Sequence, residues 1–202
     1  MLKIIDLKIG NIGSLVKAIN YLGVAYQVVD EPLGLEGASK IILPGVGNFK
    51  AASQALFATG FYDALRTKVL IEHIPILGIC VGMQLFASVG DEGGGSKGLG
   101  FFDAEVKKIN NFDGTLITPH MGWNDVHANQ LEMFFGIEED SCFYFVHSYS
   151  MRINENVNVA MTSYGENVVA YVNKGHIHGT QFHPEKSQQV GLQFLRNFIK
   201  LC

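Results

Sequence analysis

The sequence has few cysteines, no long apolar run and little net charge. Its three cysteines among 202 residues are odd in number and widely spaced, which excludes a disulfide framework and a cysteine-based zinc site. No apolar run approaches the ~20 residues that cross a bilayer. A net charge of −4 gives no electrostatic basis for binding nucleic acid or an anionic membrane. We therefore expect neither a nucleic-acid partner nor a membrane partner.

Other common signals are also missing. The chain starts directly in a strand-like segment without the apolar core of a signal peptide, which predicts a cytoplasmic protein. It has no internal repeat, no phosphate-binding glycine fingerprint and no cluster of residues at metal-ligand spacing, so we expect no metal and no cofactor. What is present is the composition of a well-packed globular protein, with 48% hydrophobic and 17% charged residues. The length suits a single domain, residues 1–202, with a sizeable core.

Strand-like and helical segments alternate in the first part of the chain. Apolar segments at 2–7, 26–29 and 40–43 are typical of buried strands, and Ser14 is a plausible N-cap for a helix between the first two. This succession implies parallel strands joined by right-handed crossovers. Ligands of such sheets bind beyond the carboxyl ends of the strands.

The second part of the chain has a different pattern. From 102 to 172, short alternating segments are separated by Asn, Asp and Gly turns, and the apolar spacing at 188–201 predicts a closing helix. We therefore predict an α/β fold of three layers. Its central sheet is mostly parallel with flanking helices, and its second half is mixed or antiparallel.

The stretch from Gly78 to Gln84, Gly-Ile-Cys-Val-Gly-Met-Gln, predicts a nucleophile on a sharp turn between a strand and a helix. Glycines two residues before and after Cys80 would let the strand and the helix approach closely. At the helix N-terminus the thiolate would be favoured, and the N–H of Val81 would face an oxyanion. A lone cysteine in an apolar strand is more often a core residue, but the two glycines favour the nucleophile.

A nucleophilic thiol needs a base and a group that orients the base. His183 is the best candidate, because the strand-like segment before it is stopped by Pro184 and would leave the imidazole at a strand end. Glu185 lies two residues further on and can reach the same ring. In isolation this His-Pro-Glu segment is typical of a surface turn. Its combination with the Cys80 turn favours a Cys-His-Glu triad.

These two motifs together resemble the class I glutamine amidotransferases. The resemblance rests on Gly-Ile-Cys-Val-Gly-Met-Gln at 78–84 and Gln-Phe-His-Pro-Glu-Lys-Ser at 181–187. Further matching segments lie at 43–47, 92–95, 98–100, 119–124 and 146–149, and they follow the family's order along essentially the whole chain. Within the family the chain is most similar to the glutaminase subunits of imidazole glycerol phosphate synthase.

The resemblance implies a catalytic and a substrate-binding role for specific residues. Cys80, His183 and Glu185 would form the catalytic triad, and the Val46 region would supply a second oxyanion N–H beside Val81. Such a subunit hydrolyses L-glutamine to glutamate and ammonia through a thioester on the cysteine. The expected substrate-binding residues are Gly45, Gly47, Gln84, Glu92, Ser148 and Tyr149.

The resemblance also implies a partner. A glutaminase subunit of this kind delivers its ammonia to a cyclase (β/α)₈ barrel, with which it forms a heterodimer in histidine biosynthesis. The candidate interface or gating residues are Asn11, Pro119, Trp123 and Lys186. Trp123 could equally be a core residue. Cys142 is expected in the core, and His120 and His147 are expected to have structural or interface roles.

Two departures from the family pattern leave alternatives open. The entry loop reads Asp-Leu-Lys-Ile-Gly-Asn-Ile at 6–12, where the family often has Asp-Tyr-Gly-x-Gly-Asn-Leu, and Ser150 follows Tyr149 where an aromatic residue or histidine is common. Both lie near the expected interface. The chain could therefore serve a sugar-amidating synthase of surface polysaccharide biosynthesis. From other classes, it could be a catalytically silent binding subunit, or a cysteine hydrolase or chaperone on the same fold.

Overall fold

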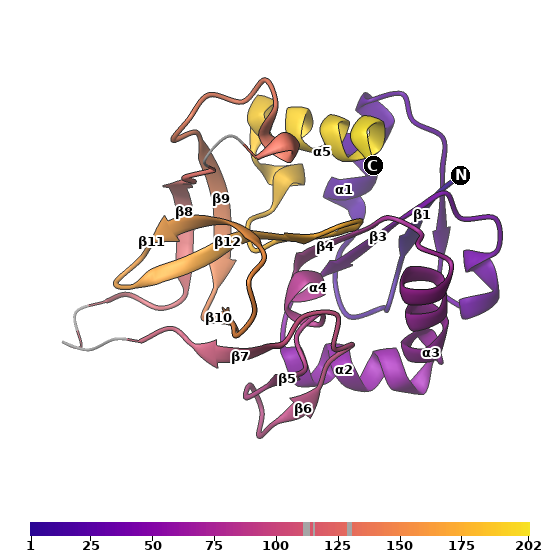
Figure 1. Cartoon of the computed structure of the whole chain (residues 1–202), viewed down its shortest axis with the longest axis horizontal. Coiled ribbons are helices and arrows are strands. Elements are labelled where there is room, and N and C mark those ends of the chain that lie inside the picture. The colour runs from indigo at the N-terminus through magenta and orange to yellow at the C-terminus, as the bar shows by residue number, and fades with distance from the viewer. Residues whose placement is uncertain (111–113, 115, 129–130) are drawn as a thin grey trace.

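The computed structural model describes residues 1–110, 114, 116–128 and 131–202. This part of the chain forms five α-helices and thirteen strands, whose arrangement is drawn in Figure 1. The helices are α1 (Gly13–Tyr21), α2 (Phe49–Ala58), α3 (Phe61–Arg66), α4 (Val81–Gln84) and α5 (Gln188–Leu201). The strands are β1 (Leu2–Ile5), β2 (Tyr26–Val29), β3 (Lys40–Gly45), β4 (Ile76–Cys80), β5 (Val89–Gly90), β6 (Ser96–Lys97), β7 (Ala104–Lys108), β8 (His120–Asp125), β9 (Cys142–His147), β10 (Tyr149–Ile153), β11 (Asn158–Ser163), β12 (Asn167–Lys174) and β13 (Ile177–Thr180).

A seven-stranded sheet forms the centre of the described structure, in the order β11-β12-β13-β4-β3-β1-β2. Neighbouring strands from β13 to β2 run parallel, whereas β11 and β12 pair antiparallel at one edge. Helices α1 and α5 lie on one side of this sheet and α2 and α3 on the other (Figure 1). The predicted three-layer α/β fold with a mostly parallel sheet is confirmed.

Burial follows from this layering. All five residues of β4 are buried, because a central parallel strand is covered by helices on both faces. Helix α1 buries Leu15, Ala18 and Ile19, whose spacing places them on one face of a helix. Ser14, expected as its N-cap, is instead the second residue of the helix, which begins at Gly13.

Close backbone packing at the end of β4 requires glycine. A Cβ on Gly82 would lie 1.8 Å from the carbonyl oxygen of Leu43 in β3, and one on Gly78 would lie 2.7 Å from the carbonyl carbon of Gly82. The expected close approach of strand and helix is therefore present. Helix α4, which follows Cys80, is a single turn that ends after Gln84. Such a short helix has little macrodipole with which to stabilise an anion at its N-terminus.

Part of the second half leaves the main sheet. Strands β10, β7, β5 and β6 form a four-stranded sheet, and β8 and β9 pair antiparallel on their own. In Figure 1 the β8–β9 pair stands beside the antiparallel edge of the main sheet. This arrangement brings β9 next to the carboxyl end of β4, as described below. The expected mixed second half is present, but only β11 to β13 belong to the central sheet.

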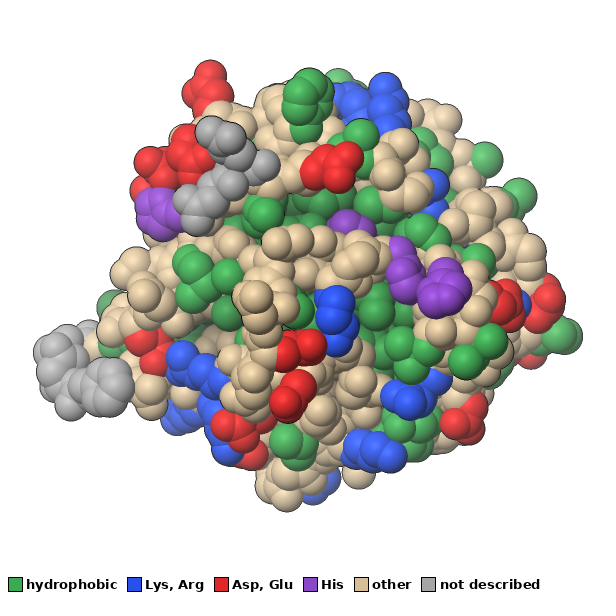
Figure 2. All heavy atoms as spheres, in the orientation of Figure 1, with side chains coloured by type: hydrophobic (Ala, Val, Ile, Leu, Met, Phe, Trp, Pro, Cys, Tyr) green, Lys and Arg blue, Asp and Glu red, His purple; other side chains and the backbone are tan. Residues whose placement is uncertain are grey.

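The surface agrees with the small net charge. On the face seen in Figure 2, acidic and basic side chains are interspersed wherever the residues are described. None of the helices in the described part of the chain has the length and apolar character needed to cross a bilayer.

Candidate active site

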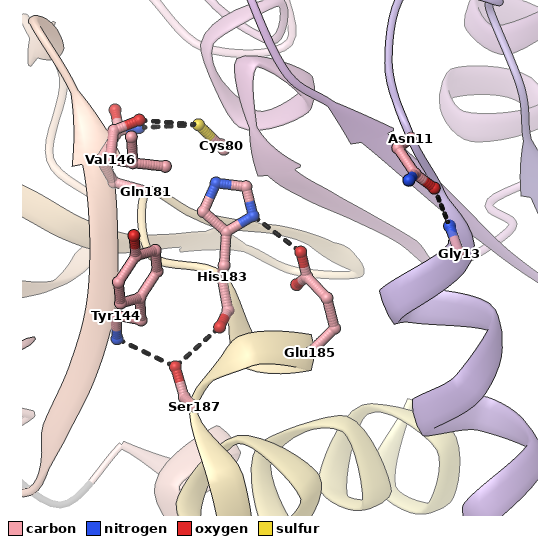
Figure 3. A network of polar contacts seen from close by, with 9 residues as sticks. All are labelled: Asn11, Gly13, Cys80, Tyr144, Val146, Gln181, His183, Glu185 and Ser187. Carbon is pink, nitrogen blue, oxygen red and sulfur yellow. Dashed lines mark hydrogen bonds and ion pairs between the residues drawn. The ribbon is translucent and has the colours of Figure 1, made fainter. Parts of the chain in front are cut away.

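The three predicted triad residues meet at the carboxyl edge of the central sheet (Figure 3). Cys80 ends β4 with a φ of 54°, a conformation that costs energy for a residue with a Cβ and is typical of a nucleophile held on a tight turn. The imidazole of His183 lies between Cys80 and Glu185. Its Nδ1 contacts Glu185 Oε1 at 2.7 Å, and its Nε2, on the Cys80 side, is buried without a hydrogen-bond partner among the described residues.

Neighbouring charges decide the protonation of His183. Burial alone would lower the pKa of this imidazole, but the Cys80 sulfur, followed by the Glu185 carboxylate, raises the pKa to about 10. His183 is only 1% exposed, so these charges act with little screening by solvent. The site therefore favours a protonated imidazolium at His183.

Two further groups contact the Cys80 sulfur. The Nε2 of Gln181 lies 3.6 Å from Sγ and donates to it, and the carbonyl oxygen of Val146 in β9 lies 3.9 Å away. An amide donor stabilises a thiolate more than a neutral thiol. Gln181 was not among the predicted site residues, although it belongs to the same motif as His183.

The loop that carries His183 is fastened to β9. The backbone N–H of His183 donates to the carbonyl oxygen of Tyr144 at 2.9 Å. The Ser187 hydroxyl accepts from the N–H of Tyr144 at 3.0 Å and donates to the carbonyl oxygen of His183 at 2.7 Å (Figure 3). These three bonds fix the catalytic loop against the small β8–β9 sheet. Ser187 was also missed, because a serine after a turn carries no signal of its distant partner.

A cavity of about 440 Å³ opens above the triad. Most of the predicted site residues line it, and they come from both halves of the chain. These are Asn11, Val46, Gly47, Cys80, Val81, Gln84, Glu92, Pro119, Ser148, Tyr149, His183 and Lys186. Its size suits a small ligand such as an amino acid. The cavity also includes His147, which was not predicted to face a ligand.

The predicted oxyanion loop adjoins the turn at Cys80. A Cβ on Gly45 would lie 2.8 Å from the backbone nitrogen of Gly82, so only glycine allows this approach of β3 to α4. Gly47 has a φ of +100°, which glycine adopts without strain. These two glycines place Val46 beside Val81 at the cavity wall.

Two predicted substrate-binding side chains are held in defined orientations. Glu92 Oε2 accepts the N–H of Phe49 at the start of α2 at 2.7 Å, which anchors the carboxylate at the cavity wall. Gln84 is 2% exposed, and its Nε2 donates to the carbonyl oxygen of Tyr149 at 3.0 Å and to Gln181 Oε1 at 2.9 Å. Both side chains belong to the predicted set.

The predicted interface residues surround the cavity mouth, with one exception. Asn11, Pro119 and Lys186 line the cavity, and the Lys186 ammonium lies 5.7 Å from the centre of the Tyr144 ring. Trp123 does not line it. Its side chain is 48% exposed and packs edge-on against Tyr144, so Trp123 is not the core residue that was considered as an alternative.

The expectation for Cys142 is corrected by the structure. Cys142 lies at the exposed end of β9 and its thiol contacts Asp125 Oδ1 at 2.8 Å, so it is not a core residue. Cys202 is partly buried, with Sγ 3.2 Å from His178 Nε2. Within the residues that the structure describes, no three acidic, histidine or cysteine side chains are grouped so as to hold a metal ion.

The buried histidines His120 and His147 form a pair beside the cavity. His120 Nδ1 and His147 Nε2 are 3.0 Å apart, across the β8–β9 ladder. Burial lowers the pKa of His120 to about 4. Burial, with smaller contributions from His120 and His183, lowers the pKa of His147 to about 3. Both rings are therefore neutral at neutral pH.

Comparison with family models and with known proteins agrees with this geometry. Residues 3–201 match the family model described as glutamine amidotransferase class-I. The chain is 46% identical over 202 residues to "imidazole glycerol phosphate synthase subunit HisH 1" of Campylobacter jejuni (strain RM1221), with 100% of both chains covered. It is 40% identical over 206 residues to "imidazole glycerol phosphate synthase subunit HisH" of Leptospira interrogans, again with 100% of both covered.

Solved structures share the fold at lower identity. A crystal structure titled as a glutamine amidotransferase superposes with a TM-score of 0.77 at 22% identity, covering 99% of this chain and 97% of the other. A glutamine amidotransferase from Thermotoga maritima superposes with a TM-score of 0.67 at 18% identity, covering 99% and 82%. At these identities the likeness shows the fold alone.

Proposed function

The chain belongs to the class I glutamine amidotransferase family, and from this premise we propose that it is the glutaminase subunit of an imidazole glycerol phosphate synthase. The observation that carries the proposal is the position of His183 between Cys80 and Glu185, with Cys80 and His183 lining an amino-acid-sized cavity. The relatives' shared name supports the synthase, and the triad supports the glutaminase chemistry.

In the first half-reaction, the Cys80 sulfur attacks the side-chain carboxamide carbon of glutamine after its proton has passed to His183 Nε2. The carbonyl oxygen becomes an oxyanion, which the N–H groups of Val81 and the Val46 loop stabilise. His183 then gives its proton to the departing nitrogen, the C–N bond breaks, and ammonia leaves. A thioester between Cys80 and the glutamyl group remains.

In the second half-reaction, a water molecule takes the place of ammonia. His183 Nε2 accepts a proton from this water, whose oxygen attacks the thioester carbon. The tetrahedral intermediate expels the Cys80 sulfur and releases glutamate. The Glu185 carboxylate contacts His183 Nδ1 throughout, which holds the ring in one orientation and stabilises its positive charge.

Substrate recognition follows from the cavity wall. Glu92 offers a carboxylate for the α-ammonium of glutamine, and the segment of Ser148 and Tyr149 offers backbone groups for its α-carboxylate. Gln84 offers its side-chain amide. These assignments explain why the cavity combines one acidic side chain with several neutral donors and acceptors.

We propose a cyclase (β/α)₈ barrel as the partner subunit, docked over the cavity mouth to receive the ammonia. Asn11, Pro119 and Lys186 at the mouth and the exposed Trp123 nearby would contact it. A half-exposed tryptophan is the kind of side chain that dominates protein interfaces. A working thiol at Cys80 must stay reduced. Because thiols are kept reduced in the cytoplasm, this requirement supports a cytoplasmic location.

The alternatives from the sequence analysis have less support. A catalytically silent subunit does not require His183 to lie between Cys80 and Glu185. A sugar-amidating synthase is not what the related proteins are named for.

The test is glutamate release from L-glutamine by the purified chain, alone and with a cyclase barrel carrying its ribotide ligand. We expect stimulation by the loaded barrel, and loss of glutamate release in Cys80→Ala without loss of the folded state. The matched control is Cys142→Ser, which alters an exposed thiol outside the cavity and should keep full activity. Glutamate release by Cys80→Ala at the wild-type rate would refute the proposal.

A further inference from the structure

The hydrogen bonds around His120 and His147 have only one consistent arrangement of protons. His147 Nδ1 lies 2.8 Å from the carbonyl oxygen of Tyr149, and a carbonyl oxygen only accepts. His147 therefore carries its proton on Nδ1. In a neutral ring the other nitrogen, Nε2, is then an acceptor, and the group facing it at 3.0 Å is His120 Nδ1. His120 must therefore also carry its proton on Nδ1.

The same argument fixes the next hydrogen bond along β8, which joins His120 to the side-chain amide of Asn124. With its proton on Nδ1, neutral His120 has an acceptor at Nε2, and Asn124 Nδ2 lies 3.2 Å from that atom. Asn124 Nδ2 also donates to the carbonyl oxygen of Ser163 at 2.9 Å. The donors of Asn124, His120 and His147 therefore all point the same way, toward Tyr149 at the cavity.

The carbonyl oxygen of Tyr149, the last acceptor in this series of hydrogen bonds, also orients Gln84, a proposed substrate-binding residue. The carbonyl oxygen of Tyr149 accepts from both His147 Nδ1 and Gln84 Nε2. Gln84 Nε2 further donates to Gln181 Oε1, and Gln181 Nε2 donates to the Cys80 sulfur. Because the NH₂ group of Gln84 faces these two acceptors, its carbonyl oxygen is the atom left for a ligand in the cavity.

Stacking keeps His120 in place. Its ring lies between Tyr164 and Phe145, at centroid distances of 3.9 Å and 4.7 Å and an interplanar angle of 17° to each. The ring is 2% exposed, so it has no room to adopt another orientation. On the same strand, Met121 and Trp123 point the other way and are exposed, as the alternation of a strand requires.

We propose that His120 is a positioning residue for the glutamine site. By donating from Nδ1 to His147, it holds the His147 proton toward the Tyr149 carbonyl, and it thereby fixes that carbonyl and the Gln84 amide in the orientation that accepts glutamine. The proposal rests on the proposed glutaminase function and assigns to it a residue that does not line the cavity.

The first test compares two variants of His120. His120→Phe keeps an aromatic ring between Tyr164 and Phe145 but removes the donor. His120→Asn keeps a donor close to the position of Nδ1. In the complex with the cyclase subunit, we expect His120→Phe to raise the KM for glutamine about tenfold with kcat changed less than about threefold, because a buried acceptor loses its donor. His120→Asn should stay within about twofold of the wild-type KM, as a retained donor predicts.

The second test needs no catalysis. In Cys80→Ala, titration with glutamine gives its dissociation constant, which His120→Phe should raise about tenfold and His120→Asn should not. Imidazole ¹⁵N NMR of the wild-type chain should show neutral His120 and His147, both protonated on Nδ1. This spectrum is informative even if His120→Phe does not fold.

Three results would overturn the proposal. They are an Nε2-protonated His147, an unchanged glutamine affinity in His120→Phe, and an equal loss of affinity in both variants, which would indicate a packing role. Failure of the proposed function would look different, because the wild-type chain would then release no glutamate whatever the histidine protonation.

Discussion

Two buried histidines line the same cavity, yet His183 is positively charged and His147 is neutral. His183 is 1% exposed and His147 is 6% exposed, so burial alone would leave both neutral. The Cys80 sulfur and the Glu185 carboxylate raise the pKa of His183 to about 10. His147 has a neutral histidine and a backbone carbonyl as neighbours, and burial lowers its pKa to about 3.

The neighbours of a buried imidazole thus decide whether it acts as a proton carrier or as a fixed dipole. His183 belongs to the carboxyl edge of the central sheet, where motifs supply a thiol and a carboxylate. His147 belongs to the small β8–β9 sheet, where cross-strand pairing supplies another histidine.

The largest effect is expected from removing the charge beside His183. In Glu185→Gln the shape is kept, but the imidazolium loses its carboxylate and the ring can adopt the wrong tautomer. We expect kcat to fall about 10²- to 10³-fold, within the range of general acid–base contributions. The measurement is glutamate release at saturating glutamine with the loaded cyclase subunit. A kcat within a factor of two of the wild type would show that Glu185 does not act on His183.

The next effect concerns stability in acid. The folded-state pKa values of His120 and His147 lie below the usual 6.5, at about 4 and about 3, so the unfolded chain binds more protons below pH 6.5. Stability contributed by these neutral rings is complete above pH 6.5 and is lost as pH falls toward their folded pKa values. Between pH 6 and pH 5 the two should lower the free energy of unfolding by about 2 kcal/mol.

Urea denaturation at each pH measures this loss. Burial lowers the pKa of His178 to about 4 as well, so three neutral rings contribute to the slope between pH 6 and pH 5, and His120→Asn should reduce it by about a third. His183 has the opposite sign, because its raised pKa contributes stability that is present below pH 6.5 and lost as pH rises toward about 10. An unchanged acid slope in His120→Asn would contradict the assignment of a neutral buried ring.

The smallest effect is expected from the hydrogen bonds that join the His183 loop to strand β9. Ser187→Ala removes the hydroxyl that bridges the carbonyl oxygen of His183 and the N–H of Tyr144. We expect the free energy of unfolding to fall by about 1–2 kcal/mol and kcat to fall about tenfold, because a buried N–H loses its partner and the His183 loop loosens.

The control for Ser187 is Ser141→Ala. The Ser141 hydroxyl also donates to a backbone carbonyl, that of Glu138 at 2.6 Å, but this bond is exposed. Its loss should change stability by less than about 0.5 kcal/mol. If both variants behaved alike, the bridge at Ser187 would not hold the catalytic loop.

Much of the parallel half of the fold could be predicted from local pattern. Strand β2 and helix α5 have the bounds expected from their apolar spacing, at 26–29 and 188–201. A short apolar run before the Cys80 turn suffices to predict a buried strand. Strands covered on both faces have such runs, and β4 is covered in this way. Ser14 was misplaced since a serine in the first turn resembles an N-cap.

The antiparallel half was harder to predict for a physical reason. Cys142 begins an apolar segment, yet its end of the β8–β9 pair is exposed. An alternating strand shows that one face is buried, but not how far along the strand the burial extends.

Two short motifs around Cys80 and His183 suffice to predict a nucleophile, its base and an orienting carboxylate, because the residue types that this chemistry needs are confined to them. The sequence by itself also determined the parallel α/β frame that brings those motifs to one edge. Only the tertiary structure decided the pairing of His120 with His147, which are 27 positions apart and meet through the β8–β9 register. Their protonation was decided there too, because it depends on burial and on neighbouring donors that come from distant parts of the chain.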